Sequence, residues 1–140
     1  MGKQSIPTLV LSFTASGAVS AMRAVGFSGA QATVQGQKVL GVSPRVVSSG
    51  GVSDVAVGGS TVIETGAAFA VGASLIVDSQ GRAIAVTGKL AIDAGATAVT
   101  STAANGSGVL VGADLPEYVF ADALEASGGV GEFVEVLLRR

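Results

Sequence analysis

The last twenty residues constrain the fold of this chain most, because they join a glycine-rich reversal to a strand that is apolar on both faces. Residues 127–131 carry three glycines in four positions, and glycine readily adopts the positive-φ conformations of a tight turn. After this turn, Val134, Val136 and Leu138 share one face at a period of two, and the other face is also apolar apart from Glu135. We therefore predict a C-terminal hairpin whose final strand is paired centrally in a sheet.

The clearest half-buried strand lies near the start of the chain. Leu9, Leu11 and Phe13 alternate with smaller or more polar residues, so their side chains are predicted to share one face. A polar leader, residues 1–6, precedes them. We predict a flexible N-terminal arm plus first strand at residues 1–14, followed by a compact β domain at residues 15–140.

Turn signals divide the rest of the chain into short strands. Residues 78–81, Asp-Ser-Gln-Gly, lie between two apolar runs and predict a hairpin with glycine in the left-handed position. The Gly-Gly pair at residues 58–59 predicts a second hairpin, between strands at 55–57 and 60–65. A strand at residues 38–42 is expected to stop at the following Ser-Pro pair, because proline cannot donate to a β-ladder.

This spacing defines the fold class. Strands at intervals of about eight to twelve residues, separated by glycine, are typical of sandwiches and barrels. We predict an all-β fold: a small single-domain β-barrel or β-sandwich of short, glycine-punctuated strands and hairpins, with at most one or two short helical turns. The 140 residues are enough for one domain, but the chain has only five Phe, one Tyr and no Trp, so oligomerisation or docking would help its stability.

Charge is sparse and unevenly distributed. Charged residues make up 13% of the chain, and no acidic residue precedes Asp54. The four bases of that first part are too dilute for a nucleic-acid footprint, so we expect no nucleic-acid partner. Residues 9–13 form too short an apolar run for a signal peptide or a membrane span, so we expect a soluble protein that is not exported and has no membrane partner.

The residues give little support to catalysis. The chain has no cysteine and no histidine, which excludes thiol nucleophiles, imidazole bases and their metal sites. Residues 106–112 read G-x-G-x-x-x-G, one residue longer than the dinucleotide fingerprint, and are better explained by a turn and a brief strand at 107–111. Paired carboxylates can hydrolyse glycosides or bind calcium, but those of the terminal hairpin alternate with apolar residues, as solvent- or interface-facing positions do: Asp122, Glu125, Glu132 and Glu135. We predict no enzyme activity, no cofactor and no metal.

The terminal hairpin also carries a family resemblance. An Ala-Leu-Glu-Ala strand at residues 123–126, a small-residue turn ending in Gly-Glu and a Val-Glu-Val-Leu-Leu run at 134–138 resemble the ending of the capsid cement (head decoration) proteins of tailed bacteriophages. Residues 66–83 are similar to the central block of these proteins, and residues 31–42 to an early block. Residues 89–117 match no part of the family, so the surface that they form is left unassigned.

The resemblance implies a structural virion protein, made in the host cytoplasm, that binds the outer surface of an assembled capsid and stabilises it. The implied partners are the major capsid protein and neighbouring cement subunits, as a homotrimer or a dimer. We expect residues 5–14 to add a strand to a neighbour's exposed sheet edge, with Leu9, Leu11 and Phe13 filling pockets. The alternative is a β-rich phage tail, fibre or adhesin-type module.

Overall fold

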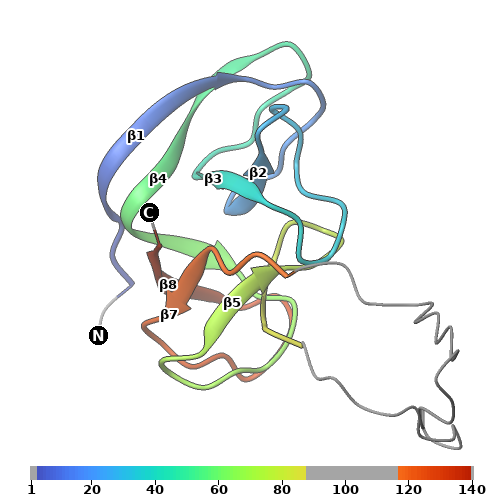
Figure 1. Ribbon diagram of the computed structural model, residues 1–140. Helices are drawn as coiled ribbons and strands as arrows, with labels where there is room; N and C mark the ends of the chain where they lie inside the picture. The colour runs from blue at the N-terminus through green and yellow to red at the C-terminus, as the bar shows by residue number, and fades with distance from the viewer. Residues whose placement is uncertain (1–2, 88–116, 140) are drawn as a thin grey trace, which may run out of the picture.

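The computed structural model describes residues 3–87 and 117–139, and these residues form eight β-strands and no helix (Figure 1). The strand at 107–111 and the glycine motif at 106–112 lie outside the described residues. The predicted all-β class is confirmed. The strands are β1 (Ile6–Thr14), β2 (Arg23–Gly26), β3 (Val39–Ser43), β4 (Val52–Glu64), β5 (Ser74–Val77), β6 (Ala83–Ala85), β7 (Ala121–Ala123) and β8 (Phe133–Leu138).

β4 is the central strand because it is paired along both edges. Ser60 of β4 pairs with Ile6 of β1 and also with Leu137 of β8, and Ala56 pairs with both β1 and β3. A strand residue has one neighbour on each edge, so β1 occupies one edge of β4, and β3 and β8 share the other. The antiparallel order is β2-β3-β4-β8-β7-β5-β6, which curls into a nearly closed barrel with β1 outside it (Figure 1).

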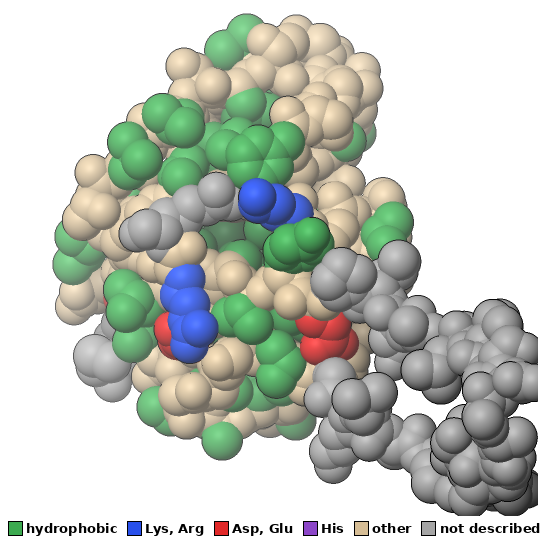
Figure 2. Space-filling model, viewed as in Figure 1, with side chains coloured by type: hydrophobic (Ala, Val, Ile, Leu, Met, Phe, Trp, Pro, Cys, Tyr) green, Lys and Arg blue, Asp and Glu red, His purple; other side chains and the backbone are tan. Residues whose placement is uncertain are grey.

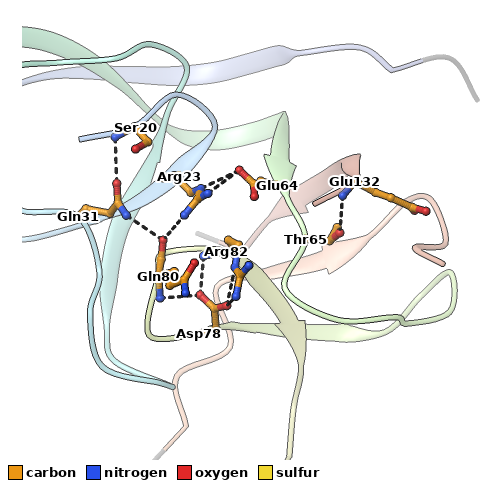
Figure 3. A network of polar contacts seen from close by, with 9 residues as sticks. All are labelled: Ser20, Arg23, Gln31, Glu64, Thr65, Asp78, Gln80, Arg82 and Glu132. Carbon is orange, nitrogen blue, oxygen red and sulfur yellow. Dashed lines mark hydrogen bonds and ion pairs between the residues drawn. The ribbon is translucent and has the colours of Figure 1, made fainter. Parts of the chain in front are cut away.

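The barrel is nearly closed where β2 meets the turn between β5 and β6. The Ala24 amide donates to the Gly81 carbonyl at 2.8 Å, and Thr65 forms an isolated parallel bridge with Ala83. Arg23 adds a side-chain contact across this seam, since its Nη1 donates to the Gln80 carbonyl at 2.7 Å. Its Nε and Nη2 donate to Glu64 Oε2 at 2.9 and 2.7 Å and so connect β2 to the end of β4 (Figure 3). Backbone and side-chain hydrogen bonds therefore join β2 to the β5–β6 turn, which are at opposite ends of the strand order.

The β5–β6 turn is itself fixed by Asp78. One carboxylate oxygen accepts from the amides of Gln80 and Arg82 at 2.8 and 2.9 Å, and the other accepts from Arg82 Nε at 2.8 Å (Figure 3). The Gln80 carbonyl, held in place by this turn, accepts from Arg23 Nη1 at 2.7 Å. The hairpin predicted at residues 78–81 is confirmed, with Gly81 at a φ of 76°.

Apolar side chains pack in two clusters. The larger fills the barrel and is built mostly of alanine and valine with Phe69 and Phe120; the smaller lies where β1 meets β2 and β4 and centres on Phe13 and Val55. The final strand is central, as predicted, because β8 lies between β4 and β7 with Val136 fully buried. Its other face is only partly covered, however: Phe133 and Leu137 there are 43% and 45% exposed.

The hairpin predicted at residues 58–59 is wrong. β4 runs without interruption through these glycines, because Gly59 pairs with Pro7 on one edge and with Leu138 on the other. Gly59 has a φ of 84°, and an added Cβ would collide with the Ile6 carbonyl oxygen and come within 2.6 Å of the Thr8 amide nitrogen. The glycine pair therefore bends a continuous strand instead of reversing the chain.

Val136→Asp is expected to prevent folding. Burying an unpaired carboxylate in the barrel core costs several kcal/mol, a large part of the stability of a domain of this size. Val130→Asp is the matched control, since that valine is 64% exposed in the turn at residues 127–131 and the change should cost less than about 1 kcal/mol. Circular dichroism and thermal unfolding of the two variants test this; a cooperatively folded Val136→Asp protein would contradict the central position of β8.

Arg23→Ala is expected to lower the free energy of unfolding by about 1.5–3 kcal/mol, the usual contribution of hydrogen bonds to charged groups. The Arg23 and Glu64 side chains are only 15% and 18% exposed, so water replaces the lost contacts poorly. Arg45→Ala removes the same charge from a side chain that is 73% exposed and lies 3.8 Å from Asp54, and should change stability by less than about 0.5 kcal/mol. Urea unfolding measures both; equal losses would mean that the seam does not depend on Arg23.

Candidate partner-binding surface

β1 offers an unpaired strand edge. It is hydrogen-bonded to β4 along one side, from Ile6 to Thr14, and no strand among the described residues pairs with its other side. Figure 1 shows β1 curving along the outside of β4, away from β5 and β7. An open edge presents a row of backbone donors and acceptors to any strand that approaches it.

The apolar side chains of β1 are mostly in contact with solvent. Leu9 is 48% exposed and Leu11 is 41% exposed, and Ile6 and Val10 are exposed as well. The strand prediction is confirmed, but the predicted half-burial is wrong for all but the last apolar residue of β1. The physical reason is that β1 packs edge-on against one strand, and the described segments leave its side chains exposed up to Phe13.

Phe13 differs from the other two predicted binding residues. Its side chain is 8% exposed and belongs to the smaller cluster, together with Val19 and Val55. Two register shifts, between Pro7 and Leu9 and between Leu9 and Val10, place Leu9 opposite Gly58, whereas Leu11 and Phe13 lie opposite Val55 and Ser53. The predicted shared face is therefore correct for Leu11 and Phe13 and wrong for Leu9, because the shifts turn it to the other face. The structure therefore leaves Leu9 and Leu11 open to a partner and uses Phe13 to anchor β1 to the protein's own core.

Sequence reasoning missed a second group of exposed apolar residues beside β1. Residues paired directly across antiparallel strands point to the same face, so Ile6, Ser60 and Leu137 form one row on the outer face of the sheet. Phe133 lies on this same face of β8. This surface was missed because both faces of β8 were predicted to be buried. The available signal in the sequence was the absence of any charged residue from 4 to 22, the range that contains Ile6.

The leader crosses this outer face. The Gln4 amide donates to Glu135 Oε2 at 3.3 Å, and the Ile6 amide donates to Ser60 Oγ at the same distance. Glu135 lies between Phe133 and Leu137 on β8, yet it is only 5% exposed. The predicted solvent- or interface-facing position of Glu135 is therefore wrong in this structure, because the leader covers it.

The carboxylates of the terminal hairpin serve local structure. Each of the four accepts from a neighbouring group: Asp122 from Arg139, Glu132 from the Gly128 amide, Glu125 from the Glu135 amide and Glu135 from the Gln4 amide. In the described ranges, 3–87 and 117–139, no three carboxylates gather in a way that could hold a metal ion. The same ranges contain no helix with the length and apolar character needed to cross a membrane.

A separate pocket opens between the start of β3 and the end of β8. Its lining comprises Lys38, Val39, Tyr118, Val119, Phe120 and Arg139, and its volume is about 210 Å³. Figure 2 shows basic side chains on either side of a hollow on this face, with apolar side chains around and between them. Hydrogen bonding and the charge of Asp122 raise the pKa of Arg139 above its ordinary value, so this rim stays cationic.

The described strands thus form a small antiparallel β-barrel with one external strand, β1. No family model matches the chain, and no curated protein matches it. Among solved structures, the N base of head fiber gp8.5 of bacteriophage phi29 is similar, with a TM-score of 0.61 and 18% identity. The match covers 94% of this chain and 95% of that chain, so the two share one fold over nearly their whole lengths.

Aspartate substitutions along β1 are expected to separate exposed from buried positions. Leu9→Asp and Leu11→Asp should shift the unfolding midpoint by no more than about 4 °C, because both side chains are half exposed and a surface substitution costs less than about 1 kcal/mol. Phe13→Asp should unfold the smaller cluster and lower the midpoint far more. Differential scanning calorimetry makes the comparison, and similar losses at all three positions would show that Leu9 and Leu11 are also packed.

Proposed function

We propose that this protein is a structural component of a tailed-phage virion that binds the outer surface of the assembled capsid and stabilises it. The observation that carries the proposal is the shared fold, over nearly the full length of both chains, with the base of a phage head fiber. The exposed, uncharged edge of β1 also supports the proposal, since an open strand edge can pair with a strand of another protein. The proposed role is structural and not enzymatic.

The binding step we propose is strand addition at β1. A strand of the major capsid protein would pair with the outer edge of β1, so that backbone hydrogen bonds supply affinity. Leu9 and Leu11 would then enter apolar pockets of the partner, because both are exposed in the unbound protein. In this arrangement β1 keeps its pairing with β4, and Phe13 keeps its place in the core. The arm need not detach to bind.

Stabilisation of the capsid follows from linkage. A protein that binds assembled shell better than free subunits shifts the equilibrium toward assembly, by an amount set by its concentration relative to its dissociation constant. Neighbouring copies, as trimers or dimers, would strengthen this effect by engaging several capsid subunits at once. The outer-face residues Ile6, Phe133 and Leu137 are available for such contacts between copies.

A second candidate is the base of a fibre, in which this domain would carry a further chain outward instead of sealing the shell. The similar solved structure is the base of a head fiber, and this favours the second candidate. The two functions differ in what they do to the shell. A cement protein raises the temperature at which the shell disrupts, whereas a fibre base binds the shell without that effect.

The deciding experiment is co-sedimentation of the purified protein with expanded, undecorated phage shells. We expect saturation at a fixed number of copies tied to the capsid lattice, and a higher disruption temperature of decorated shells. The Leu9→Asp/Leu11→Asp variant should bind at least about tenfold more weakly, because strand addition would bury two unpaired carboxylates. Val130→Asp is the matched control, an exposed valine in the glycine turn at residues 127–131.

Each outcome has a distinct meaning. Lattice-tied binding without a change in disruption temperature supports the fibre base over the cement protein. Unchanged affinity of the Leu9→Asp/Leu11→Asp variant contradicts β1 as the binding surface while leaving the virion role in place. Absence of binding to any related shell, with fibres or rings formed by the protein alone, contradicts both capsid functions.

A further inference from the structure

The pocket between β3 and β8 has a cationic rim, and each of its two cations contacts a group of the protein itself. Lys38 Nζ lies 5.8 Å from the centroid of the Phe27 ring and 6.0 Å from that of Tyr118, within the range of cation–π attraction. On the opposite rim, Arg139 Nε and Nη2 donate to the two oxygens of Asp122 at 2.5 and 2.6 Å. Neither cation therefore depends on a ligand for its placement.

Backbone hydrogen bonds hold the walls of the pocket together. The Tyr118 amide donates to the Gly36 carbonyl at 2.9 Å, and the Phe120 amide donates to the Leu75 carbonyl at 3.0 Å. The Arg139 amide donates in turn to the Phe120 carbonyl at 2.9 Å. Because main-chain bonds connect these segments, the pocket belongs to the barrel and not to a loop that would have to order on binding.

The charge of the pocket is unusual for this protein. Lys38 and Arg139 contribute two positive charges and Asp122 one negative charge, which leaves +1 at the rim in a chain whose net charge is −2. No ion pair joins Lys38 to a carboxylate within residues 3–87 and 117–139. The carboxylate of the adjacent Glu117 is engaged elsewhere, since it accepts from the Thr87 amide at 3.0 Å.

Size and lining limit the ligand. A volume of about 210 Å³ lies below the range of about 300–1,000 Å³ that cofactor and drug-sized ligands occupy, so a single side chain is the appropriate size. Val39 and Phe120 are buried and form an apolar part of the lining. Such a surface suits the methylene stem of a side chain whose charged end reaches the cationic rim.

We propose that this pocket binds a carboxylate side chain, glutamate or aspartate, presented by a partner polypeptide. Lys38 would contact the carboxylate, and cation–π attraction to its two neighbouring aromatic rings would favour a position of the ammonium group beside the pocket. The stem would pack on the half-exposed Tyr118 side chain, at the mouth of a pocket floored by Val39 and Phe120. This inference does not rest on the capsid role, because the free protein already contains every group that it needs.

The test uses the isolated protein and two capped amino acids, N-acetylglutamate amide and N-acetylglutamine amide, followed by amide resonances in NMR titrations. We expect saturable shifts at Val39, Tyr118 and Phe120 with the glutamate probe and not with the uncharged glutamine probe. Lys38→Gln should raise the dissociation constant at least about tenfold, and Lys38→Arg should restore binding in part. Arg45→Gln removes another exposed cation, outside the pocket, and should leave the affinity unchanged.

Several results would contradict carboxylate binding at this pocket. Equal shifts with the glutamine probe, or equal losses for Lys38→Gln and Arg45→Gln, would overturn carboxylate recognition at this pocket. Tighter binding of inorganic phosphate than of the glutamate probe would assign the pocket to a phosphate-bearing ligand and overturn the proposal as stated. Unchanged thermal unfolding of Lys38→Gln is the control that ties any loss of binding to the missing ammonium group.

Discussion

The pairing of β4 along both edges is the constraint on which the rest of the structure depends. Its first half binds β1 on one side and meets β3 on the other, and its second half binds β8. Bending at Gly59 lets the two halves contribute to different walls of the barrel. Because the bend carries no turn, no loop has to be closed there, and β3 and β8 are brought together along one continuous strand.

The glycine turn before β8 depends on the end of β4. Thr65, which is fully buried, donates from its hydroxyl to the Gly129 carbonyl at 2.6 Å and accepts from the Glu132 amide at 3.2 Å. Its own amide donates to the Glu132 carbonyl at 2.8 Å. A buried hydroxyl is tolerated only when it is bonded, so these contacts satisfy Thr65 and fix the turn together. A core of alanine and valine, with few aromatic anchors, relies on such polar contacts for a unique arrangement.

Local sequence patterns predicted many of the turns and strands of this fold. Where a local pattern is compatible with two structures, pairing between distant strands decides which one forms. The turn at residues 78–81 and the C-terminal hairpin follow from glycine position and period-two alternation, which are properties of a few adjacent residues. The glycine pair at 58–59 is compatible with a hairpin or a bent strand, and only the partners on both edges of β4 distinguish them. Of the predicted binding residues, Leu9 and Leu11 are exposed, whereas Phe13 reaches a cluster built from β2 and β4 that alternation cannot reveal.

The edge of β1 and the pocket beside β3 differ in how much of each is visible in the sequence. Edge strands in soluble proteins are usually protected by charge, proline or bulges, and β1 has Pro7 and two register shifts but no charged residue. Pro7 and the lack of charge are visible in the sequence once the edge is known, whereas the register shifts are not. The pocket beside β3 is not visible there, because Lys38 and Arg139 are about a hundred residues apart and come together only through the backbone contacts of residues 118–120. A partner that engaged both surfaces would combine backbone pairing, which is indifferent to sequence, with a charge contact that selects for an acidic residue.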